Sequence, residues 1–559
     1  MLCASLTLIL CAVAILPANA GESTVDDGQV QLTPEIILTG EKYVCEKNPS
    51  KHGYAYYGIR YGNAKRFKPS EVNTDYSYLS SPTRGPKQGY VCPQHPMAFP
   101  GLPMRNLSMS EDCLYLDVYV PPISKEKPAA FPVLLWIHGG GFQFGEKDLY
   151  NATGLAAAID AVVVTINYRL FAFGFLTTGD GVLKGNYGLG DVKTALKWVK
   201  QNIRKFDGNA DAITILGESA GGALTSAAFL DKNVRENVRA AIAMSGSMLT
   251  VWAMNHDAKL GVVTLANLLG CPVNQGTASM AQCIEEAPFE KILNVSTGIG
   301  KNITMQFLFA PVVDGEQLSD KPAQMIPKQE NSDSKANFIT GFLREDSSLI
   351  LAMMNRDLFA PNATFNHETA KKLVSNAIRL LSPCDLSDTV EQVLEQYKIV
   401  ESDERRDLIR KVYHVTTDLK FGFPAIQEAL LYANRTFSSS VPNQLYRISY
   451  DPQYQGLGSF HVLDVVLLFS GQLKALLANQ TVDDQVVADF REMFRQVAHT
   501  GRIDGPDVGT EVKYMEFGQS GKWETGTDDF RGTVNFWSNI IQNSRNCSAT
   551  KLKDISSGK

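Results

Sequence analysis

Short, almost continuously apolar runs recur through the first half of the chain and alternate with helical patterns. Residues 132–138 (PVLLWIH), 161–168 (AVVVTINY) and 212–216 (AITIL) are such runs, and they are typical of strands that are buried on both faces of a sheet. Between the last two, residues 190–204 repeat their apolar side chains at helical spacing. This alternation predicts an α/β fold with a mostly parallel central sheet flanked by helices.

The same alternation continues towards the C-terminus. Residues 238–244 (VRAAIAM), 336–342 (ANFITGF) and 444–450 (QLYRISY) predict three further strands, and the helical stretch at 403–414 is expected to cover the sheet and line the mouth of a site. No internal repeat or low-complexity linker interrupts the chain. We therefore expect one domain over residues 21–559, ending in a short polar tail.

The first twenty residues, MLCASLTLILCAVAILPANA, have the pattern of a secretory signal peptide. The apolar stretch 6–16 is too short to span a bilayer, and residues 18–20 have the small-x-small form of a cleavage site. We predict that residues 1–20 are removed and that the mature protein is secreted and soluble, because no other stretch could span a membrane. Eight N-x-S/T sequons favour this route and predict glycosylation: Asn106, Asn151, Asn294, Asn302, Asn362, Asn434, Asn479 and Asn546.

Charge and cysteine content narrow the class of protein. The net charge of −6 and the lack of a basic run argue against a nucleic-acid partner. Two of the nine cysteines lie in the leader, and the remaining seven should mostly pair in an oxidising compartment. They lack metal-ligand spacing, so no metal or cofactor is implied. Because seven is odd, at least one thiol is free or pairs between molecules, with Cys547 as a candidate, and a monomer and a homodimer both remain open.

The strongest local motif is GESAG at residues 217–221, between the predicted strand 212–216 and a predicted helix. In this context G-x-S-x-G lifts a serine hydroxyl out of the strand on a sharp turn. The following helix N-terminus directs backbone N–H groups at any oxyanion that forms there. A bare Gly/Ser turn arises easily by chance, but the strand–turn–helix context makes Ser219 the candidate nucleophile.

A second motif, HGGG at residues 138–141, follows the predicted strand 132–138. Its glycines allow the backbone to approach a substrate closely with its N–H groups free to donate. Loops of this type supply oxyanion donors in esterases and lipases. A flexible strand-exit loop would explain HGGG alone, but two such motifs in one chain favour a serine hydrolase.

A serine hydroxyl needs a base, usually a histidine whose tautomer is fixed by a carboxylate. In this fold the order is Ser, then Asp or Glu, then His. Of the five histidines after Ser219, His461 lies in a glycine-rich loop shortly after the predicted strand 444–450 and is the preferred base. The other four lie before any acid, beside a sequon, within a helix or at a helix end: His256, His367, His414 and His499.

The carboxylate should follow a strand that lies between the serine and the histidine in sequence. Glu345 and Asp346 both come just after the predicted strand 336–342. Either could instead be a solvated loop charge paired with Arg344, and spacing alone does not choose between them.

Taken in order, these segments resemble the type-B carboxylesterase and cholinesterase-like family of α/β-hydrolases over nearly the whole mature chain. The landmarks are Arg66-Phe67, SEDCLYL at 110–116, HGGGF at 138–142, GLGDVKTALKWVKQN at 188–202, GESAGG at 217–222, PVVDG at 311–315 and His461. The resemblance implies an α/β-hydrolase fold and hydrolysis of carboxylic esters.

The resemblance also implies roles for individual residues. Ser219 is the nucleophile, His461 the base and Asp346 the acid, with Glu345 as the fallback acid. The implied oxyanion donors are the N–H groups of Gly140, Gly141 and Ala220, and the implied substrate pocket includes Glu218, Trp252 and Phe307. Two family disulfides fall on Cys92–Cys113 and Cys271–Cys283, which leaves the fate of Cys45, Cys384 and Cys547 open.

Two departures from the family narrow the substrate. No tryptophan lies between Cys92 and Cys113, so the cation–π site that cholinesterases use for a quaternary ammonium is missing. Glu218 stands where juvenile-hormone esterases usually carry Gln, which leaves a hormone esterase unsupported. We therefore predict a secreted serine carboxylesterase that acts on small, uncharged esters.

Two alternatives remain at this stage. The same fold carries catalytically silent adhesion or recognition proteins, because fold does not fix function. A hormone- or lipid-directed esterase would use the same catalytic residues.

Overall fold

The computed structural model describes residues 28–45, 48–80, 86–95, 107–122, 130–296, 308–328, 336–360, 362–381, 386–434, 443–470, 473, 477, 482–509 and 511–557. The predicted signal peptide, Phe307, Cys384, Asn106, Asn302 and Asn479 lie outside these residues. The side chains of Cys45, Asn546 and Cys547 also lie outside the described part. Within the described ranges, no helix combines the length and apolar character that a bilayer span requires.

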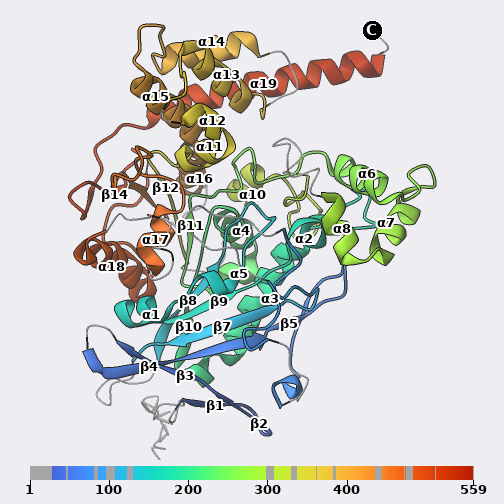
Figure 1. The fold of residues 1–559 in the computed structure, drawn as a ribbon, viewed down its shortest axis with the longest axis vertical. Helices are drawn as coiled ribbons and strands as arrows, with labels where there is room; N and C mark the ends of the chain where they lie inside the picture. The colour runs from blue at the N-terminus through green and yellow to red at the C-terminus, as the bar shows by residue number, and fades with distance from the viewer. Residues whose placement is uncertain are drawn as a thin grey trace, which may run out of the picture.

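A large mixed sheet forms the centre of the molecule (Figure 1). Its neighbours from β14 to β9 pair in parallel, whereas both edges are antiparallel. The strands, in spatial order, are β15 (Trp523–Thr525), β14 (Met515–Phe517), β13 (Asn443–Ile448), β12 (Asn337–Leu343), β11 (Ala240–Met244), β10 (Gly208–Glu218), β8 (Phe131–Ile137), β9 (Val162–Ile166), β7 (Tyr115–Val120), β4 (Asn48–Arg60) and β3 (Glu41–Cys45). The predicted fold, a mostly parallel central sheet flanked by helices, is confirmed.

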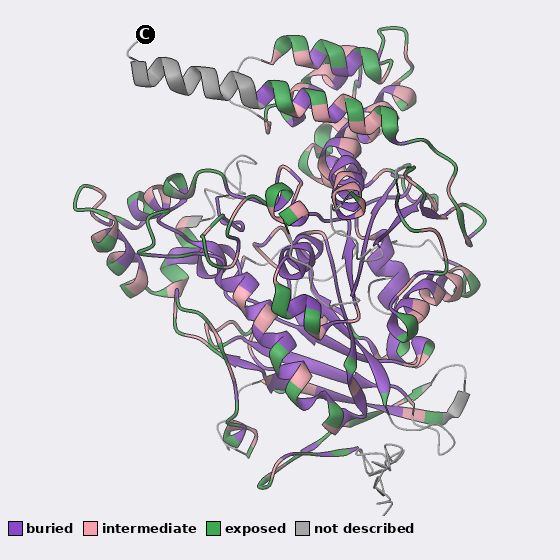
Figure 2. Ribbon diagram, turned by 180° about the vertical axis from the view of Figure 1, so that it is seen from behind, coloured by how far each residue is buried: buried purple, intermediate pink, exposed green. Residues whose placement is uncertain are grey.

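The central strands are apolar throughout because helices cover both faces of the sheet. Along β8, Val133, Leu135 and Ile137 belong to one core cluster, and Leu134 and Trp136 belong to the other. Figure 2 shows the sheet buried between its helical layers. The first cluster includes α3 (Tyr187–Asn202), α4 (Ala220–Phe229) and α16 (Phe423–Ala433), and the second includes α1 (Thr153–Ile159), α17 (Leu463–Phe469) and α18 (Asp484–Thr500).

Further helices gather beyond the carboxyl end of β12, which is where α11 (Ser348–Met354) begins. In Figure 1 these helices lie at one end of the molecule together with α19 (Arg531–Ser557). They are α12 (Arg356–Phe359), α13 (His367–Ile378), α14 (Ser387–Gln396) and α15 (Arg405–Thr417). A short π-helix, η4 (Asp418–Gly422), joins α15 to α16.

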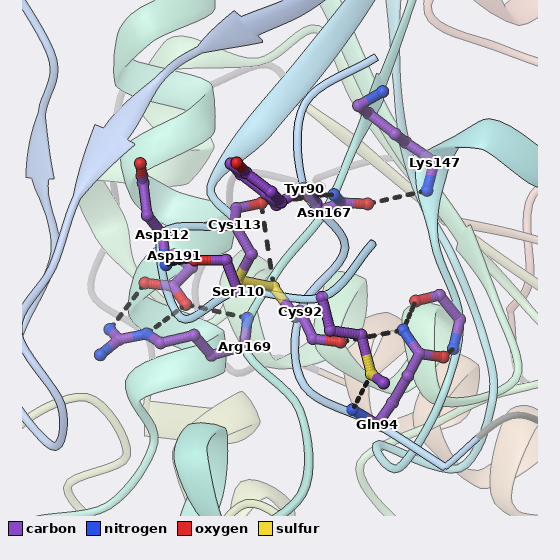
Figure 3. Close-up of a disulfide and its surroundings, with 12 residues drawn as sticks. Tyr90, Cys92, Gln94, Ser110, Asp112, Cys113, Lys147, Asn167, Arg169 and Asp191 are labelled. Atoms are coloured by element: carbon purple, nitrogen blue, oxygen red, sulfur yellow. Dashed lines mark hydrogen bonds and ion pairs between the residues drawn. A yellow bond between two sulfur atoms is a disulfide. The ribbon is translucent and has the colours of Figure 1, made fainter. Parts of the chain in front are cut away.

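Two disulfides close short segments of the chain, as the family resemblance implied. Cys92 pairs with Cys113, and Cys271 pairs with Cys283. Figure 3 shows the first bridge with the buried Arg169–Asp191 ion pair beside it. Asn167 Nδ2 donates to the Cys113 carbonyl oxygen at 3.3 Å, so the loop that this disulfide closes is also bonded to the segment after β9.

Candidate active site

Ser219 lies on a sharp turn between the end of β10 and the start of α4. Its backbone has φ 56° and ψ −122°, a conformation that is sparsely populated by residues with a side chain. The Ser219 N–H donates to the Met244 carbonyl oxygen at 2.9 Å, which fixes the turn to the neighbouring strand β11. The hydroxyl-bearing residue is partly exposed, whereas the residues on either side of it are buried.

The glycines of GESAGG are required by close backbone contacts. A Cβ added at Gly221 would lie 2.1 Å from the Ile137 carbonyl oxygen, and one at Gly222 would lie 2.6 Å from the Met244 carbonyl oxygen. Glycine therefore allows the first turn of α4 to sit directly against the ends of β8 and β11.

The HGGG loop packs against the same turn. A Cβ added at Gly139 would lie 2.6 Å from Glu218 Oε2 and 3.1 Å from Ser219 Cβ. Gly140 and Gly141 have φ values of 104° and 61°, which favour glycine. Among the described residues, their N–H groups have no intramolecular acceptor.

A further donor comes from α4, since Ala220 is the first residue of this helix and its N–H is not used within it. The helix N-terminus also carries a partial positive charge. These three N–H groups are thus the candidates for an oxyanion site beside Ser219.

His138 is a structural residue of this loop. Its ring stacks on Tyr168 with centroids 4.4 Å apart, and Nδ1 lies 2.8 Å from the Gly139 carbonyl oxygen. Burial lowers the pKa of His138 to about 4, against the opposing hydrogen bond to Gly139, so this imidazole is neutral at physiological pH.

His461 and Asp346 come together from two different loops. His461 Nδ1 lies 2.6 Å from Asp346 Oδ1, and both side chains are buried. The other carboxylate oxygen, Oδ2, accepts a hydrogen bond from the Leu343 N–H at 3.0 Å at the end of β12. This second bond orients the carboxylate towards the imidazole, the arrangement needed to fix a histidine tautomer.

Glu345, the other candidate acid, faces away from His461. Its Oε1 lies 3.2 Å from His414 Nε2 on α15, and its Oε2 accepts a hydrogen bond from the Ser459 N–H at 3.1 Å. The contacts therefore distinguish the two adjacent carboxylates, Glu345 and Asp346, which sequence spacing could not do.

The remaining ring nitrogen of His461 faces Glu218. Nε2 lies 3.1 Å from Glu218 Oε1, and the described residues contain no hydrogen bond from His461 to Ser219 Oγ. Burial lowers the pKa of His461, but the charge of Glu218 and the hydrogen bond with Asp346 outweigh it and raise the pKa to about 9. Burial raises the pKa of Glu218 to about 7 although His461 opposes this.

Aromatic side chains form a wall beside this histidine. Phe421 of η4 lies with its ring centroid 5.0 Å from that of His461 and 5.9 Å from that of Trp252. Trp252 in turn lies 6.2 Å from Phe142 of the HGGGF segment, and its Nε1 donates to the Lys420 carbonyl oxygen at 3.1 Å. The predicted pocket residue Trp252 is thus near the catalytic candidates.

The sequence analysis missed two residues of this region. Asp464 is fully buried on α17. Burial, together with the charges of Glu218 and Asp346, raises its pKa well above the ordinary value. Its place in the otherwise apolar segment LDVVLLF was a usable signal, because a carboxylate in an apolar helix is seldom buried without a partner. Phe421 had no such signal, since it comes from a π-helix.

Comparisons with known proteins identify the family of this chain. The sequence model of the Carboxylesterase family matches residues 31–544. Carboxylesterase 1C of Rattus norvegicus is 29% identical over 76% of this chain and 76% of its own length. The Carboxylic ester hydrolase of Bombus ignitus is 28% identical over 88% of this chain and 91% of its own length. The Bile salt-activated lipase of Bos taurus is 30% identical over 70% and 67%, respectively. The chain therefore belongs to the carboxylesterase family and is a carboxylic ester hydrolase.

Proposed function

We propose that this protein is a secreted serine carboxylesterase that works through a covalent acyl-enzyme, with Ser219, His461 and Asp346 as its catalytic triad. The observation that carries the proposal is the convergence of a strained serine turn with a buried histidine–aspartate pair. Ser219 has φ 56° at the start of α4, and His461 Nδ1 lies 2.6 Å from Asp346 Oδ1.

In the first half of the reaction, Ser219 Oγ attacks the ester carbonyl carbon while His461 Nε2 takes the hydroxyl proton. This step needs a small shift of the imidazole from Glu218 towards Ser219, and such contacts often tighten only when substrate is bound. Collapse of the tetrahedral intermediate breaks the bond to the alcohol. His461 returns the proton to the leaving alkoxide, so an alcohol leaves and an ester to Ser219 remains.

The oxyanion of the tetrahedral intermediate is held by the N–H groups of Gly140, Gly141 and Ala220. Each such donor typically lowers the barrier by ~3 kcal/mol, because it is already oriented when the charge develops. The positive φ of the two glycines and the helix start at Ala220 support this assignment.

In the second half, a water molecule replaces the alcohol. His461 takes a proton from this water as it attacks the acyl-enzyme, and the proton then returns to Ser219 Oγ as the carboxylic acid leaves. Asp346 keeps Nδ1 protonated and stabilises the imidazolium that forms in both halves. The scheme uses only the residues named here and involves no cofactor.

Small, uncharged esters are the proposed substrates. The wall of Trp252, Phe421 and Phe142 supports an apolar acyl or alcohol group. Since one relative is a Bile salt-activated lipase, a lipid ester is the second candidate. A series of esters with increasing acyl length distinguishes the two, because a lipid-directed enzyme would gain activity with chain length.

Export through the secretory pathway is part of the proposal, with residues 1–20 as the signal peptide and residues 21–559 as one mature domain. Two disulfides support an oxidising compartment. The sequon asparagines whose side chains are described are all exposed, as glycosylation requires: Asn151, Asn294, Asn362 and Asn434.

The test is active-site labelling of the secreted protein with a fluorophosphonate probe, which reacts only with an activated serine. We expect labelling of the wild type and none of Ser219→Ala or His461→Ala, with all three proteins secreted at similar levels. A well-folded wild type that neither labels nor hydrolyses a short ester would overturn the proposal and favour a catalytically silent recognition protein.

A further inference from the structure

The loop that carries His461 has an irregular backbone, and its side chains Tyr454, Leu457 and Phe460 pack into the core. It runs from residue 449 to residue 462, between β13 and α17, and has no helix or strand of its own. Several of its residues have positive φ values, and Val462, directly after His461, has φ 68°. A β-branched residue in this region is strained and persists only where the surroundings impose it. Contacts outside the loop, such as the hydrogen bond from Ser459 Oγ to the Ile448 carbonyl oxygen at 2.7 Å, must therefore keep this backbone in place.

Glu345 makes two further contacts on Ser459, two residues before His461. Its Oε2 accepts a hydrogen bond from the Ser459 N–H at 3.1 Å, and its own N–H donates to the Ser459 carbonyl oxygen at 3.2 Å. Glu345 thus occupies both backbone polar groups of one loop residue. We call these two bonds the Glu345–Ser459 clasp.

The carboxylate of Glu345 is itself fixed. Its Oε1 lies 3.2 Å from His414 Nε2 on α15 and 3.6 Å from Arg344 Nε, and the side chain is 12% exposed. The loop backbone comes so close that a Cβ added at Gly458, which has φ 66°, would lie 2.8 Å from Glu345 Oε2. The acceptor and the chain that it binds therefore fit closely.

We propose that Glu345 is a positioning residue for His461, acting through the Glu345–Ser459 clasp. This inference rests on the proposed function, in which His461 is the base. Two adjacent residues divide the work: Asp346 binds the imidazole, and Glu345 binds the loop that carries it. Glu345 supplies an acceptor oxygen at hydrogen-bond distance from the Ser459 N–H, and the negative charge of its carboxylate is not required.

Two substitutions in the full-length secreted protein test the length and the charge of the Glu345 side chain separately. Glu345→Gln keeps an acceptor oxygen at the same reach but is neutral, and we expect kcat within about threefold of the wild type. Glu345→Asp keeps the charge but is one methylene shorter. Because its carboxylate no longer reaches the Ser459 N–H, the hydrogen bond that positions the loop is lost, and we expect kcat to fall by about tenfold or more. KM for a short neutral p-nitrophenyl ester should stay within about twofold, since substrate contacts are unchanged.

The matched control is Asp451→Ala. Asp451 is a carboxylate of the loop that carries His461, and its Oδ1 accepts from the Gln453 N–H at 2.7 Å within that loop. We expect its kcat to equal that of the wild type. Hydrogen–deuterium exchange of peptides from 449–462 gives a readout independent of catalysis, and we expect faster exchange in Glu345→Asp only.

The outcomes are distinct. A Glu345→Asp protein with wild-type kcat and wild-type exchange would overturn the positioning role of the Glu345 side chain. A Glu345→Gln protein as impaired as Glu345→Asp would also overturn it, because the charge would then matter instead of the reach. If the wild type neither labels nor hydrolyses esters, the proposed function fails. The exchange of Glu345→Asp against the wild type still decides whether Glu345 holds the loop.

Discussion

Glu218 is one of the groups that set the proton affinity of His461, the proposed base, because its Oε1 lies 3.1 Å from His461 Nε2. Its negative charge favours the imidazolium and contributes to raising the pKa of His461 to about 9, whereas burial alone lowers that pKa. As the proposed base, His461 must be neutral to accept the serine proton, so we expect kcat/KM to rise as the pH passes its pKa. Removal of the charge lowers this pKa, and the active form then appears at a lower pH.

We therefore expect Glu218→Gln to move the acid limb of the kcat/KM profile to lower pH by about one unit or more. Glu428→Gln is the matched control. Glu428 is also a buried carboxyl, and burial raises its pKa to about 7, but it bonds to Ser226 Oγ instead of a catalytic group. Its profile should match that of the wild type. An unmoved limb in Glu218→Gln, or a shift to higher pH, would contradict the electrostatic role of Glu218.

At this scale, residue type and sequence order predicted Ser219 and His461 as catalytic residues, and the structure shows the local features behind that prediction: a sharp turn at Ser219 and a buried carboxylate beside His461. Sequence spacing could not choose between Glu345 and Asp346 as the acid, because they are neighbours and the direction of each carboxylate depends on partners distant in sequence. Asp346 meets His461, and Glu345 meets His414 and Ser459. No rule based on sequence spacing predicts those contacts.

At the scale of elements, the start of α4 depends on glycine because strand ends press against it. A Cβ at Gly221, the second residue of α4, would lie 2.1 Å from the Ile137 carbonyl oxygen. We expect Gly221→Ala to lower the free energy of unfolding by about 1 to 3 kcal/mol, the usual range for overpacking. It should also reduce fluorophosphonate labelling, since relief of the clash displaces Ser219.

Gly154 provides the control, because it is the second residue of α1, is exposed, and has nothing within 4 Å of an added Cβ. Gly154→Ala should stabilise the protein by about 0.5 to 1 kcal/mol and leave labelling unchanged. Thermal denaturation and labelling rates measure both effects. Equal stability changes in the two variants would show that the clash at Gly221 is relieved without cost.

The elements that the sequence predicted are those with a strong local signal. The apolar run at 132–138 is β8 (Phe131–Ile137), and the helical spacing at 403–414 belongs to α15 (Arg405–Thr417). In contrast, β4 (Asn48–Arg60) has many polar and glycine residues, and it joins the antiparallel edge of the sheet by pairing with distant β7. Such a strand is stabilised by tertiary pairing, which a local pattern does not contain.

At the scale of the whole molecule, the two disulfides constrain the unfolded chain to a similar extent. Cys92–Cys113 spans 21 residues and Cys271–Cys283 spans 12. The entropy of loop closure depends weakly on length, so each contributes about 3 kcal/mol. In a chain of 559 residues the entropy of unfolding is large, and 3 kcal/mol corresponds to a fall in Tm of only about 3 °C.

The burial of the cysteines then determines which disulfide contributes more to the free energy of unfolding. Cys92 and Cys113 are at most 1% exposed, whereas Cys271 is 7% exposed and Cys283 is only partly buried. Replacing the buried pair with alanine leaves a cavity that adds about 1 to 2 kcal/mol. We therefore expect Tm to fall by about 4 °C in Cys92→Ala/Cys113→Ala and by about 3 °C in Cys271→Ala/Cys283→Ala. Calorimetry of the two secreted double variants measures the order, and a larger fall in the second variant would mean that local contacts outweigh burial at these bridges.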